Sequence, residues 1–361
     1  MSQLNRGRIQ RVLEHMTQAG VEQMIVTSPV SIFYLTGEMV HPGERCLALY
    51  LNTDGNVTLV VNQLHNYIRL DGAKVVFFHD TEDPVAILAK EVKPGKLGID
   101  KEWPARFLIR MMELRPDAPV INGSVFVDMT RMVKDAEEQE KLRRSSAMND
   151  RVVAKSIEAI QEGLSEVDLA EKVNAFFAAE GAAVKNLCIV AYGKYCAIPH
   201  HGPSKEVFLQ PGDNVLFDIG KSLDGYYCDM TRTVCYKSAT ALQKEVYQIV
   251  LEANLAAIEA VKPGVRACDV DAAARKIIEK AGYGEYFTHR TGHNIGIEVH
   301  EWPDISSTND MPLVPGMCFS IEPGVYLPDS VGVRIEDLVI VTQTGCEVLN
   351  HYPKQLQIVG A

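Results

Sequence analysis

Hydrophobic and polar positions alternate with two different periods along the first 130 residues. The first twenty residues place Ile9, Leu13 and Met16 on one face at helical spacing, which predicts an amphipathic helix. Further helical and extended patterns follow one another in the segments 23–28, 46–51, 57–61, 74–78, 84–92, 96–100 and 104–114. The turn-forming run 53–56 separates two of the apolar segments and is typical of a β-hairpin. We therefore expect a small α/β domain at the N-terminus.

The pattern changes near residue 128, where a long charged stretch begins. Residues 135–163 keep apolar side chains at roughly helical spacing, at Leu142, Val153, Ile157 and Ile160. We place the domain boundary just before this stretch. The sequence thus predicts an N-terminal domain over 1–129 and a larger domain over 130–361.

The larger domain contains an internal duplication. Three residues at relative positions 0, 5 and 18 occur twice, as Gly163, Asp168 and Gly181 and then as Gly264, Asp269 and Gly282. A Pro-Gly pair followed by an acid and a glycine also occurs twice, over 211–220 and 315–324, with Asp218 and Glu322 as the acids. Two ordered matches about 100 residues apart predict two similar α+β halves facing each other across a pseudo-twofold axis.

Composition and charge narrow the class of protein. The 361 residues are 47% hydrophobic and 23% charged, as in an ordinary globular protein. The net charge is −11 and no stretch collects Lys and Arg, so we expect neither nucleic acid nor an anionic membrane as a partner. No run approaches the roughly 18 apolar residues of a membrane span, and the N-terminus lacks the apolar core of a secretion signal. We therefore expect a cytoplasmic protein.

Candidate metal ligands lie in the strand-like segments of the larger domain. Asp218 and Asp229 are 229 − 218 = 11 residues apart, consistent with neighbouring strands joined by the turn 223–225. Glu322 and Glu336 form a second pair of acids, again separated by a turn-rich link. Histidines cluster in two segments, as His200 and His201 and as His289, His293 and His300.

Acids inside apolar strands need partners, because burying an uncompensated carboxylate costs several kcal/mol. Arg232 and Arg334 could neutralise two of the four acids in a purely structural role. The duplicated acid pair together with the glycine-flanked His293 favours a metal site instead. Four carboxylates and one imidazole form a hard, oxygen-rich donor set that suits Mn²⁺, Fe²⁺ or Co²⁺. So much negative charge suits two ions that share bridging carboxylates.

At these residues the sequence resembles the creatinase/prolidase/methionine aminopeptidase family, whose catalytic domain has the "pita-bread" fold. The resemblance covers essentially the whole chain, including an N-terminal domain similar to that of prolidases and aminopeptidases P. The family's metal-ligand motifs D-x-G, Y-x-[SC]-D-x-T-R-T, T-G-H-x-I-G, E-P-G and G-V-R-I-E-D match here at Asp218, Asp229, His293, Glu322 and Glu336. Departures are small: Asn294 replaces a common Gly, Cys228 a common Ser, and His201 follows His200.

The resemblance implies the roles of these residues. The five matched residues would hold two divalent ions, with Mn²⁺ as the first expectation and Co²⁺, Fe²⁺ or Zn²⁺ as alternatives, and Asp229 and Glu336 would bridge them. Glu322 would also serve as the general base. The remaining residues would handle the substrate and the transition state or orient a ligand, namely His200, His289, His300 and Arg334.

The resemblance also implies the substrate and the rival functions. It favours an Xaa-Pro dipeptidase, with an Xaa-Pro aminopeptidase acting on longer peptides as the alternative, and the compact length tips the choice toward the dipeptidase. Methionine aminopeptidases generally lack the N-terminal domain. A non-catalytic binding module and a metal-free creatinase-like hydrolase are disfavoured, because those relatives lose ligands that are present here. A homodimer is expected from the family alone.

Overall fold

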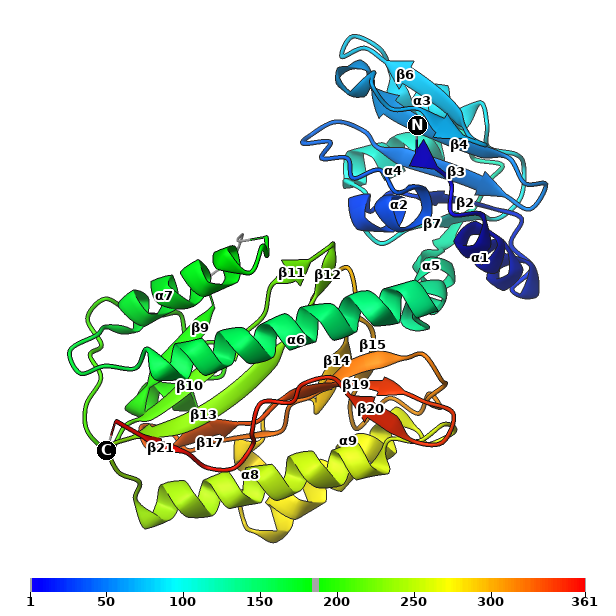
Figure 1. Ribbon diagram of the computed structural model, residues 1–361. Helices are drawn as coiled ribbons and strands as arrows, with labels where there is room; N and C mark the ends of the chain where they lie inside the picture. Colours follow the sequence, from blue (N-terminus) through cyan, green and yellow to red (C-terminus); the bar gives the residue numbers. More distant parts are fainter. Residues whose placement is uncertain (1, 184–187, 361) are drawn as a thin grey trace. The chain divides into compact units, whose positions relative to one another are not determined.

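The computed structural model describes residues 2–183 and 188–360 (Figure 1). By internal packing the chain divides into two compact units, Met1–Arg131 and Met132–Ala361. Each unit has its own hydrophobic core, built around Ile25 and Leu88 in the first and mainly around two large clusters in the second.

The first unit is built on a six-stranded mixed sheet with the strand order β6-β4-β3-β2-β7-β8. Its strands are β2 (Gln23–Val26), β3 (Ala48–Asn52), β4 (Val57–Asn62), β6 (Lys74–Phe78), β7 (Leu97–Ile99) and β8 (Val120–Asn122). A short parallel pair, β1 (Ser2–Gln3) and β5 (Leu70–Asp71), lies outside this sheet. Strands β3 and β4 form the expected antiparallel hairpin, and Gly55 at its turn has a φ of 85°. Only glycine adopts such a φ without steric cost.

Helices flank this sheet. They are α1 (Arg6–Gln18), α2 (Pro29–Thr36), α3 (Pro84–Ala89), α4 (Ala105–Leu114) and α5 (Ser124–Met132), with the short 3₁₀ turn η1 (Gln63–His65). The predicted apolar face of α1 needs one correction: Ile9, Val12 and Met16 are buried, whereas Leu13 is only partly buried. Val12 extends the stripe of Ile9 and Met16 at a spacing of three and four residues, and Leu13 lies one residue around the helix from it.

The second unit contains two larger sheets. The four-stranded sheet has the order β21-β13-β10-β9 and the five-stranded sheet has the order β15-β14-β16-β19-β20. The strands of the first are β9 (Ile189–Tyr192), β10 (Asn214–Ile219), β13 (Met230–Tyr236) and β21 (Ile358–Val359). Those of the second are β14 (Gly292–Asn294), β15 (Glu301–Ile305), β16 (Cys318–Ile321), β19 (Asp337–Val341) and β20 (Cys346–Val348). Two short hairpins join β11 (Ser222–Leu223) to β12 (Tyr226–Tyr227) and β17 (Gly324–Tyr326) to β18 (Gly332–Arg334).

A pair of helices packs on each of these sheets, so that the strands lie between the two pairs (Figure 1). The pairs are α6 (Ala136–Glu158) with α7 (Glu166–Ala179), and α8 (Ala241–Ala260) with α9 (Ala267–Lys280). Short 3₁₀ turns η2 (Gly193–Ala197) and η3 (Gly284–Tyr286) complete the unit. The α+β architecture with two similar halves is therefore the one that the sequence predicts.

The duplicated residues occupy equivalent places in the two halves. Gly163 and Gly264 precede α7 and α9 with φ values of 82° and 83°. Gly181 and Gly282 follow the same helices with φ values of 84° and 88°. This left-handed backbone explains why glycine recurs at both ends of each helix.

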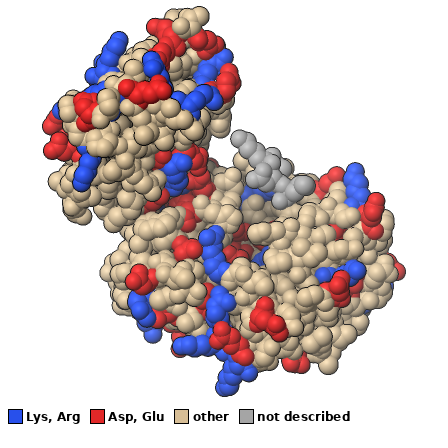
Figure 2. All heavy atoms as spheres, turned by 180° about the vertical axis from the view of Figure 1, so that it is seen from behind, with Lys and Arg blue, Asp and Glu red and all other residues tan. Residues whose placement is uncertain are grey.

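The described helices and the visible surface bear on two features, a membrane span and a strongly charged face. Among residues 2–183 and 188–360 there is no helix with both the length and the apolar character that a membrane crossing requires. Figure 2 shows basic and acidic side chains interspersed on the visible face of each unit.

Candidate metal centre

All nine predicted site residues line one cavity of the second unit, with a volume of about 810 Å³. They are Asp218, Asp229, His293, Glu322, Glu336, His200, His289, His300 and Arg334. The duplication accounts for this convergence, because each half contributes two acids.

The strands place the acids at corresponding points in the two sheets. Asp218 lies in β10, and Asp229 directly precedes the antiparallel partner strand β13. In the second half Glu322 directly follows β16, and Glu336 directly precedes its antiparallel partner β19. His293 lies in β14 and is the imidazole ligand candidate of the set.

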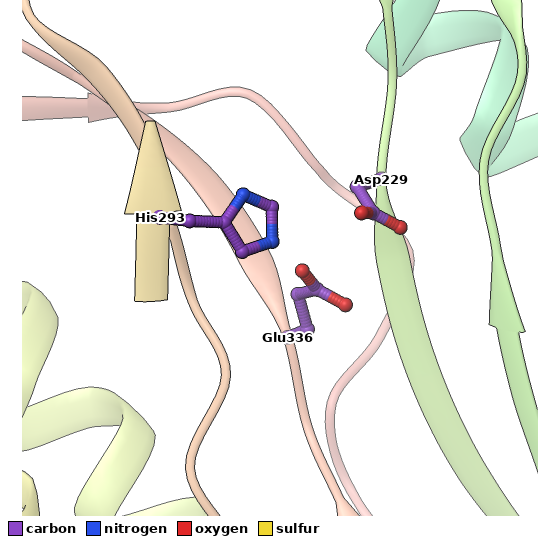
Figure 3. A group of neighbouring side chains, drawn as sticks. All are labelled: Asp229, His293 and Glu336. Carbon is purple, nitrogen blue, oxygen red and sulfur yellow. The ribbon is translucent and has the colours of Figure 1, made fainter. Parts of the chain in front are cut away.

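Three of these side chains already form a compact donor group. One ligand atom each from Asp229, His293 and Glu336 lies within 4.8 Å of the others, and Figure 3 shows the three side chains converging. All three residues are buried, with exposed fractions of 8%, 3% and 1%. The Oε1 atom of Glu336 is buried and has no hydrogen-bond partner within the described parts of the chain. A bound cation would satisfy this oxygen, so the donor set fits a divalent metal ion.

The two buried acids are costly to ionise without a cation. Burial raises the pKa of Asp229 to about 8, with a further contribution from the charge of Asp218. Burial also raises the pKa of Glu336, and the charge of Asp229 adds to the effect. A divalent ion would compensate both charges and stabilise the ionised carboxylates.

Glu322 and His293 form a second contact within the site. The Nε2 of His293 lies 3.3 Å from Oε1 of Glu322, and its Nδ1 lies 3.2 Å from the carbonyl oxygen of Asn294. Burial opposes ionisation of Glu322, but the hydrogen bond with His293 and the charges of His293, His289 and Arg334 together outweigh it and lower the pKa of Glu322 to about 2. In the metal-bound protein a proton on Nδ1, donated to the Asn294 carbonyl, would leave the Nε2 lone pair available for the ion in place of the hydrogen bond to Glu322.

Arg334 is held by three hydrogen bonds and orients the acids around it. Its guanidinium donates to Oδ2 of Asp218 at 2.6 Å, to the hydroxyl of Tyr326 at 2.8 Å and to Oγ1 of Thr231 at 3.1 Å. Thr231 in turn donates to Oε2 of Glu336 at 2.8 Å. Arg334 is therefore linked to Glu336 through Thr231.

Arg232, the second arginine considered from the sequence, does not bond a carboxylate of the candidate ligand set among the residues described. The guanidinium of Arg232 donates to Oδ1 of Asp337 at 2.7 Å and to the main-chain oxygen of Glu336 at 2.6 Å. It therefore pairs with an acid outside the candidate ligand set. Arginine thus compensates Asp218, but neither Asp229 nor Glu336 has an arginine bonded to its carboxylate in the described structure, which favours the metal interpretation over the purely structural one.

Tyr326 belongs to the site and was not found from the sequence. Its hydroxyl lies 2.8 Å from Nε2 of His289, whose Nδ1 lies 2.7 Å from the carbonyl oxygen of Arg290. If Nδ1 carries the proton of a neutral His289, Nε2 accepts from Tyr326, while Tyr326 accepts from Arg334. Burial raises the pKa of Tyr326 to about 12 and lowers the pKa of His289, so both groups stay neutral near pH 7. The position of Tyr326, four residues after Glu322, was the available signal.

The two-unit architecture and the acid-rich, histidine-bearing cavity fit a metallopeptidase. The model of the metallopeptidase family M24 matches residues 140–343, and the creatinase/prolidase N-terminal domain matches residues 8–133. The chain belongs to the metallopeptidase family M24, whose members act with divalent metal ions, and the expected pita-bread architecture is confirmed.

Similar proteins match over nearly their whole length. An Xaa-Pro dipeptidase of Lactobacillus helveticus is 38% identical over 92% of this chain and 94% of its own. An Xaa-Pro dipeptidase of Lactobacillus delbrueckii subsp. lactis is 36% identical over 99% of both chains. The crystal structure of a recombinant prolidase from Thermococcus sibiricus superimposes with a TM-score of 0.91 at 36% identity, covering 98% of each chain.

Proposed function

We propose that this metallopeptidase is an Xaa-Pro dipeptidase with two divalent ions held by Asp218, Asp229, His293, Glu322 and Glu336. The observation that carries the proposal is the convergence of both acid pairs and His293 on one cavity. The names of the similar Lactobacillus and Thermococcus proteins support the substrate class. In this proposal Asp229 and Glu336, which are buried and lie at equivalent strand ends, would supply the carboxylates that both ions share.

The side chains would divide the work of hydrolysis. When bound, the ions lower the pKa of a bound water and polarise the scissile carbonyl. Glu322 would accept the proton of the attacking water. His200 and His300 would donate hydrogen bonds to the developing oxyanion and to the leaving proline nitrogen or its carboxylate. Arg334 would orient Asp218 through their hydrogen bond, and His289 would hold Tyr326 in place beside the cavity.

Metal removal and replacement of the bridging acids test the metal part of the proposal. Exhaustive chelation should abolish peptidase activity, and Mn²⁺ should restore it better than Zn²⁺. The variants Asp229→Asn and Glu336→Gln should lose bound metal and lower kcat by at least about a hundredfold. The exposed acid Glu259 offers a matched control, because Glu259→Gln should change neither quantity. Full activity in a preparation free of metal would refute the mechanism.

Substrate length separates the dipeptidase from the aminopeptidase alternative. Xaa-Pro and Xaa-Pro-Yaa peptides should be compared under Mn²⁺ with the same enzyme. A dipeptidase recognises the proline carboxylate, so we expect a higher kcat/KM for the dipeptides. If the tripeptides reach an equal or higher kcat/KM, the Xaa-Pro aminopeptidase function should replace the one proposed.

We also propose that the protein is a homodimer. The family resemblance supports this, and sedimentation tests it by distinguishing 40.0 kDa from 2 × 40.0 = 80.0 kDa. A monomer at working concentration would contradict it. The cytoplasmic location and the lack of nucleic-acid and membrane partners stay predictions from charge and hydropathy.

A further inference from the structure

The two cavity histidines His200 and His300 share an unusual local setting. Both side chains are exposed, and neither residue lies in a helix or strand. An exposed side chain on an irregular segment is held only weakly by packing, although the ring of His300 does lie edge-on to that of His293, with centroids 4.2 Å apart. In each case, however, the next residue along the chain has a mostly buried side chain, with exposed fractions of 13% for His201 and 4% for Glu301.

His201 is bound to a carboxylate that is fully buried. Its Nε2 donates to Oε2 of Glu166 at 2.7 Å, and the side chain of Glu166 is 0% exposed. The same carboxylate accepts the main-chain N–H of Tyr192 at 2.8 Å and that of Ser204 at 2.9 Å. The ring of His201 also stacks on Tyr195, with centroids 4.9 Å apart. Glu166 therefore ties together the end of β9 and both sides of the segment that carries His200.

Glu301, the residue after His300, is also fixed by buried contacts. Its Oε2 lies 2.9 Å from Nζ of Lys134, whose side chain is 0% exposed. Its Oε1 accepts the main-chain N–H of Ile297 at 2.9 Å and that of Glu298 at 3.2 Å. A Cβ at Gly296 would lie only 2.8 Å from this oxygen, so the segment needs glycine there to approach the carboxylate. These bonds close residues 297–301 into a small loop that contains His300.

None of these four side chains is itself part of the cavity wall among the described residues. The duplication places Ala267, not an acid, at the position equivalent to Glu166, so the anchors are not copies of one repeated scaffold feature. Buried polar pairs add little to stability compared with apolar residues of similar size, so stability alone does not account for two of them. Their shared feature is that each fixes the residue next to an exposed histidine.

We propose that Glu166–His201 and Lys134–Glu301 are positioning pairs that fix His200 and His300 at the cavity. This inference rests on the proposed role of the two histidines in peptide hydrolysis. Loss of a pair would let its histidine move away from the reacting atoms, and small displacements of this kind are costly to turnover. Each pair acts through its own histidine, and neither changes the metal ligands.

The test is a set of double-mutant cycles. Glu166→Gln should lower kcat/KM about tenfold, mainly through kcat, in the otherwise unchanged enzyme and in a His300→Gln background. In a His200→Gln background the same change should cost less than about twofold, because the residue it positions is already gone. Glu301→Gln should show the reverse pattern, with its effect lost only when His300 is replaced. Metal content should stay unchanged in all of these variants.

Controls separate positioning from general destabilisation. Glu171 is an exposed acid on the same helix as Glu166, and Glu171→Gln should leave kcat/KM unchanged. If Glu166→Gln does not fold, His201→Asn removes the same bond from the other side and should give the same pattern. An equal loss in both histidine backgrounds would overturn the inference.

The cycles should use the best substrate of a panel of Xaa-Pro, Xaa-Pro-Yaa and proline-free peptides. Failure of the enzyme to prefer Xaa-Pro peptides would then count against the proposed function only. Failure of the cycles would count against the positioning pairs only.

Discussion

The guanidinium of Arg334 donates a hydrogen bond to the carboxylate of Asp218 over 2.6 Å and so joins the two halves of the duplicated unit. Asp218 lies in β10 of the first half, and Arg334 ends β18 of the second. The arginine is 2% exposed, so its charge is compensated mainly by the groups bonded to it. One acid of the cavity thus has a permanent protein cation, which leaves Asp229 and Glu336 as the acids that depend on metal.

Replacement of Arg334 should destabilise the protein and disturb the site together. Arg334→Met leaves Asp218 without its cation, and breaking a buried pair in this way costs about 3 kcal/mol of unfolding free energy. Arg334→Lys keeps the charge but not the three directed bonds, so its unfolding free energy should lie between those of the wild type and Arg334→Met. Denaturant unfolding of the metal-free proteins measures the difference. The exposed pair Arg266–Asp269 provides a control, since Arg266→Met should have little effect. A wild-type midpoint for Arg334→Met would show that Asp218 is compensated from elsewhere.

The histidines should separate into a ligand and a substrate-handling group. His293→Ala removes a donor from the compact group around Glu336 and should lower the metal content measured by mass spectrometry. His300→Ala should keep the metal content yet lower kcat about a hundredfold, because His300 is proposed to stabilise the transition state. Equal metal loss in both variants would mean that His300 is also a ligand.

The metal-free protein should lose stability as the pH rises. The pKa of Asp229 is raised to about 8 from 3.8, so between these values the folded state holds a proton that the unfolded chain releases. The favourable contribution of the protonated group is complete below pH 3.8 and is lost as the pH rises toward 8. Asp229→Asn does not titrate, so without metal it should melt several degrees above the wild type at pH 8.

Melting curves of both proteins in chelator across this pH range test the effect. The difference between their melting temperatures should shrink toward pH 4. At pH 8 saturating Mn²⁺ should make the wild type the more stable of the two. A metal-free Asp229→Asn protein that is no more stable than the wild type at pH 8 would contradict the assigned protonation of Asp229.

Local sequence patterns were sufficient to predict much of the fold. The Thr53–Asn56 turn specifies its hairpin because the turn residues act on their own backbone. The repeated glycines located both helices of the duplication, because a left-handed φ is a property of the single residue. The sequence did not fix the buried face of α1, because Val12 and Leu13 are both apolar and only the packing of the folded unit selects between them.

The candidate ligands were also accessible from the sequence, whereas their supporting bonds were not. Asp229 and Glu336 stand in distinctive motifs, but the bond from Thr231 to Glu336 joins residues 105 positions apart. Lys134 and Glu301 are separated by 167 positions, and nothing in either local sequence points to the other. Such contacts are created when distant strands pack together, so they become visible only in three dimensions.

The separation of Asp229 from His293 and Glu336 along the chain has a thermodynamic consequence. An ion held by these three side chains would fasten the first half of the unit to the second, closing a loop of 293 − 229 = 64 residues. Such an ion acts as a removable crosslink, and its binding energy adds directly to the cohesion of the two halves. Metal supply would then govern how long the folded enzyme survives as well as how fast it works, and a chain nicked between β13 and α8 should come apart more readily once the ion is removed.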